Sequence, residues 1–156
     1  ATVMAPDDLH AILRYCTDVI KKYVAALDAA GADTIAILEP TGGLLSPRDY
    51  TTFSGQYVAE IIKEMKALPI LHICGQTTKL LPVMCETGAQ GLSLDSMVVF
   101  PEVAKTVPSD VVLIGNLDPV AIMKQETPEQ VYKAGTELLE AMKAKKELQE
   151  NAGKYE

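Results

Sequence analysis

Four short apolar segments recur along this chain, and a helical segment follows each of them. The apolar segments cover residues 33–39, 69–75, 90–95 and 110–116. Each is short and leads into turn residues, a pattern that is typical of strands. Regular alternation of strands with helices predicts a parallel sheet that helices cover, because a helix usually connects one parallel strand to the next.

The helical segments carry their own start and stop signals. An amphipathic stretch from Leu9 to Leu27 precedes the first strand and stops at Gly31. Ser46 and Pro47 are typical of a helix start, as N-cap and first helical residue. The last helix is predicted to begin at a capping box over residues 127–130 and to run to about residue 150. Shorter helices are predicted over residues 77–87 and 101–106, and one or two helical turns over residues 119–124.

Two architectures fit this α/β alternation: part of a (β/α)₈ (TIM) barrel, or a small doubly wound sheet. No glycine-rich phosphate-binding motif follows any of the strands, which disfavours the nucleotide-binding form of the second. A complete barrel needs about 250 residues. Because the chain has 156, we expect a partial barrel with about four parallel strand–helix units, and residues 1–156 forming a single domain.

Charge and cysteine content exclude several classes of protein. A net charge of −7 argues against a nucleic-acid partner, since phosphates attract basic surfaces. No apolar run reaches the length that a membrane span needs, so we expect no membrane association. Three cysteines without disulfide-like spacing predict a reducing, cytoplasmic setting.

The strand at residues 69–75 contains two metal-binding residue types two positions apart. Side chains alternate along a strand, so His72 and Cys74 should share one face while Leu71 and Ile73 share the other. An imidazole nitrogen and a thiolate at this spacing suit two corners of a zinc tetrahedron. The alternative from the pair alone is a core histidine beside a core cysteine.

Polar residues also end the other predicted strands. They are Glu39, Asp95, Asn116 and Asp118. The carboxyl ends of parallel strands meet at one edge of the sheet, where α/β enzymes assemble their sites, so a common site is predicted. The alternative is that these are ordinary turn residues.

The remaining cysteines are predicted to be structural. Cys85 lies late in a helix that runs away from the site at ~1.5 Å per residue, so it is too far away to be a third metal ligand. It is predicted to be a thiol in the core. Cys16 lies on the apolar stripe of the first helix.

Several segments together resemble a known family. They are residues 71–75 (LHICG), 86–88 (ETG), 91–95 (GLSLD) and 112–116 (VLIGN). They resemble the uroporphyrinogen decarboxylase superfamily, and within it the zinc methyltransferases that carry a methyl group from a methylated corrinoid protein to coenzyme M or a similar thiol. The resemblance covers residues 6 to about 150 and implies the carboxyl-side portion of a (β/α)₈ barrel.

The resemblance implies roles for the singled-out residues. His72 and Cys74 would bind zinc, and a further cysteine ligand of the family has no match before residue 156 and is expected beyond it. Asp95 would be a catalytic residue, either a ligand in the thiol-free state or a base beside the metal. Glu39, Asn116 and Asp118 would line the substrate pocket. The implied partners are a corrinoid protein, which carries its own corrinoid, and a small thiol acceptor.

Alternatives stay open at this point. One is a metal-free enzyme of tetrapyrrole metabolism like uroporphyrinogen decarboxylase, another is a non-catalytic corrinoid- or tetrapyrrole-binding module, and a third is that these 156 residues alone are inactive. Half a barrel has two open sheet edges and an uncovered inner face, which predicts a homodimer or aggregation.

Overall fold

The computed structural model describes residues 2–152, with side chains described as far as residue 143. Within these residues a parallel sheet has its strands in chain order, β1-β2-β3-β4. The strands are β1 (Thr34–Leu38), β2 (Leu68–Ile73), β3 (Gly91–Leu94) and β4 (Val112–Ile114). Every predicted strand is therefore present; each is shorter than predicted, and β2 begins one residue earlier.

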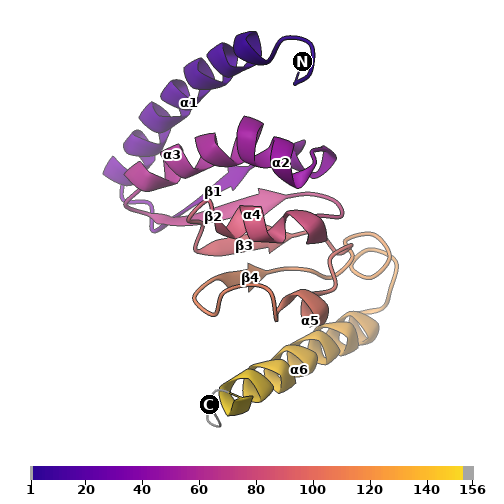
Figure 1. Cartoon of the computed structure of the whole chain (residues 1–156). Helices are drawn as coiled ribbons and strands as arrows, with labels where there is room; N and C mark the ends of the chain where they lie inside the picture. The colour runs from indigo at the N-terminus through magenta and orange to yellow at the C-terminus, as the bar shows by residue number, and fades with distance from the viewer. Residues whose placement is uncertain (1, 153–156) are drawn as a thin grey trace.

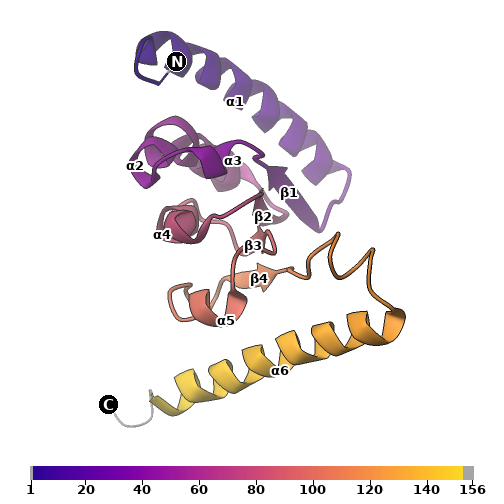
Figure 2. The same cartoon turned by 90° about the vertical axis from the view of Figure 1, so that its right-hand side faces the viewer.

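Helices connect the strands and cover one face of the sheet (Figures 1 and 2). They are α1 (Pro6–Ala29), α2 (Pro47–Tyr50), α3 (Gln56–Glu64), α4 (Leu81–Cys85), α5 (Phe100–Val103) and α6 (Pro128–Ala152). A π-helical segment, Thr51–Gly55, joins α2 to α3. Helix α1 packs on α3 beyond β1, and α6 packs on α5 beyond β4.

The strand order decides between the two predicted architectures. A doubly wound sheet reverses its strand order at one point and carries helices on both faces. Here the order never reverses, and among the described residues the second face carries no helix (Figure 2). The structure therefore confirms an α/β fold that forms part of a (β/α)₈ barrel.

The core lies between the sheet and the helices that cover it. Leu71 and Ile73 of β2 and Leu92 and Leu94 of β3 are buried against this helix layer. Leu81 and Met84 of α4 and Phe100 of α5 complete the same cluster. We call the covered side of the sheet the helix face and the opposite side the open face.

Local capping signals agree with the structure at two helix starts. The Ser46 hydroxyl accepts the Asp49 N–H, and Pro47 is the first residue of α2. The Thr127 N–H donates to the Gln130 side chain while the Gln130 N–H donates to the Thr127 hydroxyl, which is a capping box. These bonds satisfy N–H groups that a helix start would otherwise leave unpaired.

Two predicted segments differ in detail. Residues 119–124 form hydrogen-bonded turns and no regular helix: the Asp118 carboxylate accepts the N–H groups of Val120 and Ala121 as an N-cap would, and the Ile122 N–H donates to the Asp118 carbonyl. The stripe of α1 is only partly buried: Val24 lies in a core cluster, whereas Ile12 and Cys16 are exposed.

Within residues 2–152, no helix combines the length and the apolar character that crossing a bilayer requires.

Candidate metal centre

Strand β2 presents different chemistry on its two faces. Leu71 and Ile73 point into the helix face and are 0% exposed. His72 is half-buried and Cys74 is exposed, because the alternation of the strand carries both to the open face. The predicted sharing of one face by His72 and Cys74 agrees with this arrangement.

The two side chains lie next to each other. Nε2 of His72 and Sγ of Cys74 are 3.2 Å apart. Two such atoms bound to one tetrahedral zinc would be about 3.6 Å apart, given Zn–N and Zn–S bonds of about 2.1 and 2.3 Å. The pair therefore fits two positions of a zinc site with little movement of either side chain.

Ser93 orients the histidine from the neighbouring strand. The register of β2 and β3 places Ser93 beside His72, and the Ser93 hydroxyl is hydrogen-bonded to Nδ1 of His72 at 2.9 Å. With Nδ1 occupied in this way, Nε2 is the nitrogen that faces Cys74. A hydrogen bond to the second ring nitrogen is what metal-binding histidines usually have.

Asp95 lies directly after β3 and holds the loop that follows Cys74. Its carboxylate accepts the N–H of Gly75 at 3.0 Å and the N–H of Met97 at 3.1 Å. These two N–H groups, first that of Gly75, lower the pKa of the Asp95 carboxyl. The ionised carboxylate thus fixes the backbone beside Cys74, and its oxygens are engaged by these bonds.

No group of three or more His, Cys, Asp or Glu side chains is arranged around a common ion within the described part of the chain. The chain brings together His72 and Cys74 as potential ligands, with Ser93 and Asp95 supporting them. A metal held here would need further ligands from a thiol substrate, water or another segment of protein.

Glu39 lies on the other face of the sheet. Leu38 pairs with His72 in the register, so alternation turns the next side chain, that of Glu39, toward the helix face. There it lies near Tyr50 and Ser54, and burial raises the pKa of the Glu39 carboxyl while these two hydroxyl groups act in the opposite direction. The structure does not bring Glu39 to the open face with His72 and Cys74.

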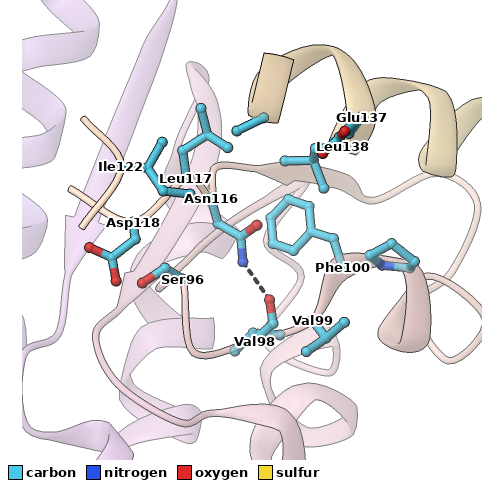
Figure 3. A pocket seen from close by; sticks show the side chains of 12 residues that line it. Ser96, Val98, Val99, Phe100, Asn116, Leu117, Asp118, Ile122, Glu137 and Leu138 are labelled. Atoms are coloured by element: carbon cyan, nitrogen blue, oxygen red, sulfur yellow. Dashed lines mark hydrogen bonds between the residues drawn. The ribbon is translucent and has the colours of Figure 1, made fainter. Parts of the chain in front are cut away.

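Asn116 and Asp118 line a separate pocket after β4 (Figure 3). The pocket has a volume of about 310 Å³, and its walls come from α5, α6 and the loops after β3 and β4. The Asn116 amide donates to the backbone carbonyls of Asp95 and Val98, which ties the pocket to the Asp95 loop. Neither His72 nor Cys74 lines this pocket.

Sequence reasoning missed Ser93. It lies two residues before Asp95 in a strand that is otherwise apolar, so alternation alone would have placed it on the same face. Cys85 packs against the core as predicted, and burial raises the pKa of its thiol.

Comparison with known proteins identifies the family. The family model described as uroporphyrinogen decarboxylase (URO-D) matches residues 1–153. The chain belongs to the uroporphyrinogen decarboxylase family. This confirms the resemblance found in the segments around His72, Asp95 and Asn116.

Relatives within this family carry two kinds of name. A methylcobamide:CoM methyltransferase, MtbA, of Methanosarcina acetivorans is 39% identical over 135 residues, which is 83% of this chain and 40% of that protein. A uroporphyrinogen decarboxylase of Methylobacillus flagellatus is 35% identical over 140 residues, 86% of this chain and 39% of that protein. The chain thus spans about two fifths of the length of these relatives.

A solved structure shares the fold. A methyltransferase from Methanosarcina mazei superposes with a TM-score of 0.75 at 24% sequence identity, over 80% of this chain and 38% of that one. At this identity the likeness concerns the family's fold.

Proposed function

We propose that the protein takes part in zinc-dependent methyl transfer from a methylated corrinoid protein to a small thiol such as coenzyme M. The observation that carries the proposal is the 3.2 Å separation of His72 Nε2 and Cys74 Sγ on the open face. The relative named methylcobamide:CoM methyltransferase supports the same chemistry. A decarboxylase reaction gives no reason for an exposed thiol beside an imidazole nitrogen.

Each residue of the site has a distinct task in this proposal. His72 and Cys74 would hold the metal, Ser93 would keep Nε2 of His72 directed at it, and Asp95 would hold the loop at Gly75. Bound zinc would supply a lowered pKa for the acceptor thiol, which then stays a thiolate at neutral pH.

The exposure of Cys74 suits a substrate that arrives with a partner. A corrinoid is a large group, and a partner protein that carries it needs an open approach to the reacting thiol. The open face at the carboxyl ends of β2 and β3 offers this approach. A free thiolate ligand also needs a reducing setting, which keeps the prediction of a cytoplasmic location within the proposal.

The ligand assignment is tested by measuring zinc per chain. The unchanged chain and Cys74→Ala are purified in parallel and analysed for metal, with Cys85→Ala as a control that removes a thiol outside the site. We expect Cys74→Ala to lose zinc and Cys85→Ala to keep it. Equal zinc in the unchanged chain and Cys74→Ala would end the assignment.

A second candidate function is that of a metal-free enzyme of tetrapyrrole metabolism. It is supported by the relatives that are named uroporphyrinogen decarboxylase. It predicts a chain without zinc that binds tetrapyrroles. A non-catalytic corrinoid-binding module instead predicts corrinoid binding that survives Cys74→Ala. Titration of the unchanged chain and of Cys74→Ala, each with a porphyrin and with methylcobalamin, separates these outcomes from the proposed function.

A further inference from the structure

The turn that follows β1 lies directly against the backbone of Cys74. A Cβ atom added to Gly43 would be 2.9 Å from the carbonyl oxygen of Cys74. Contacts this short essentially do not occur, and a backbone carbonyl cannot swing away as a flexible side chain can. Only glycine at position 43 therefore lets this turn close on Cys74 without displacing it.

The opposite side of the turn lies against the half-buried side chain of Glu39. A Cβ atom added to Gly42 would be 2.7 Å from both carboxyl oxygens of Glu39. Glu39 is itself anchored, because its N–H donates to the carbonyl of His72 at 2.9 Å. The ring of Tyr50, which is 0% exposed, lies on the same side of the sheet. The turn therefore lies in close contact with the Glu39 carboxyl group on one side and the Cys74 carbonyl on the other.

Cys74 is held from its other side as well. The N–H of Gly75, the next residue, donates to the Asp95 carboxylate after β3. The backbone that carries the thiol is therefore fixed between the loop after β1 and the loop after β3. This restraint from both sides falls on a proposed metal ligand.

We propose that the Gly42–Gly43 turn, braced by Glu39, is a positioning element that sets the distance of the Cys74 thiol from the His72 imidazole. The inference rests on the zinc site of the proposed function and adds Gly42, Gly43 and Glu39 to the residues that shape it. These residues act through the Cys74 backbone and do not touch the metal.

The test is a Co²⁺ titration of the full chain, followed by the thiolate-to-cobalt charge-transfer absorption. Gly43→Ala pushes a methyl group against the Cys74 carbonyl, so we expect Co²⁺ affinity to fall by about 10-fold or more, as for other residues that orient metal ligands, with a shifted band. Gly42→Ala meets only the end of the Glu39 side chain and should show a smaller loss. It also provides a variant that folds if Gly43→Ala does not.

Gly31→Ala is the matched control. Gly31 has φ +87° and nothing within 4 Å of an added Cβ, so alanine there strains the backbone without touching the site. It should lower stability and leave Co²⁺ affinity and spectrum unchanged. If the unchanged chain binds Co²⁺ and both Gly42→Ala and Gly43→Ala bind it equally well with the same band, the positioning role is overturned.

A second measurement separates this inference from the proposed function. If the unchanged chain binds no Co²⁺, the zinc site fails, and the rate of Cys74 alkylation by iodoacetamide in the metal-free chain then decides the positioning role. Mass spectrometry of the Cys74 peptide gives the rate. We expect a severalfold change in Gly43→Ala and none in Gly31→Ala, and equal rates in all three chains would overturn the inference.

Discussion

The two faces of β2 carry different kinds of residue. Leu71 and Ile73 are 0% exposed under the helices, whereas His72 and Cys74, one residue away from each, reach the open face. Strand β3 repeats the division, with Leu92 buried and Ser93 beside His72. The alternation of a strand thus separates the residues that stabilise the fold from the residues of the proposed site.

The strongest way to break this comparison is to delete the same side chain from each face. Leu71 and Leu38 lie on adjacent strands, 0% and 69% exposed. Leu71→Ala should lower the free energy of unfolding by about 2–5 kcal/mol, because it leaves a cavity. Leu38→Ala should change it by no more than about 0.5 kcal/mol. Urea denaturation of both variants measures the difference, and similar losses would mean that the open face is also covered in solution.

Ser93→Ala tests whether the open face can lose function without losing stability. Removing the hydroxyl frees Nδ1 of His72, so metal affinity should fall by about 10- to 100-fold. The free energy of unfolding should change by about 1 kcal/mol or less, since one partly exposed hydrogen bond is lost. Competition with a chelator gives the affinity, and Ser109→Ala, at an exposed serine outside the site, is the matched control. Unchanged affinity in Ser93→Ala would contradict the orienting role.

The two faces also predict opposite responses to pH. Burial raises the pKa of Glu39 on the helix face. The protonated carboxyl group therefore adds to the free energy of unfolding at pH values below its unfolded pKa, and this stabilisation is lost as the pH rises through the folded pKa. Hydrogen bonds from backbone N–H groups lower the pKa of Asp95. The ionised carboxylate therefore adds to the free energy of unfolding at pH values above its unfolded pKa, and this stabilisation is lost as the pH falls through the folded pKa.

Substitution at each carboxyl group isolates these two responses. Glu39→Gln should stabilise the chain at neutral pH, where an ionised buried carboxylate costs free energy, and Asp95→Asn should destabilise it there. Urea midpoints between about pH 3 and 8, a range that spans the ordinary carboxyl pKa values, measure both. Parallel pH curves for the two variants and the unchanged chain would show that neither carboxyl group has the described environment.

The smallest expected effect concerns an ion pair on the outer surface. Arg14 of α1 and Glu60 of α3 are 2.6 Å apart, with 53% and 39% of their side chains exposed. Arg14→Ala should lower the free energy of unfolding only slightly, and by less at high salt, because both charges are largely exposed to water. Denaturation at low and high salt checks this, and a loss as large as that of Leu71→Ala would show that charges rather than apolar packing secure the helix layer.

Much of the fold follows from local patterns in the sequence. The apolar runs predicted every strand, and Ser46-Pro47 and Thr127–Gln130 predicted helix starts, because these signals depend on neighbouring residues alone. Residues 119–124 begin with a helical bond from the Ile122 N–H to the Asp118 carbonyl but do not continue as a regular helix, and no local pattern predicts where this segment stops.

The site was predictable where it depends on alternation and not where it depends on register. His72 and Cys74 share a strand, so their common face could be inferred. Glu39 comes from a different strand, and its turn toward Tyr50 follows from the pairing of Leu38 with His72, which no local pattern reveals. The close approach of Gly43 to Cys74 likewise involves residues that are distant in sequence.

The parallel arrangement of β1 to β4 bears on how such proteins diversify. Strands β1 to β4 all end at the same edge of the sheet, which we call the rim. The loops at the rim can change in length or composition while the pairing of the strands stays intact. A scaffold of this kind can exchange one chemistry for another by altering a few rim residues. Relatives with the same framework and the names of two different reactions are the expected product of that freedom.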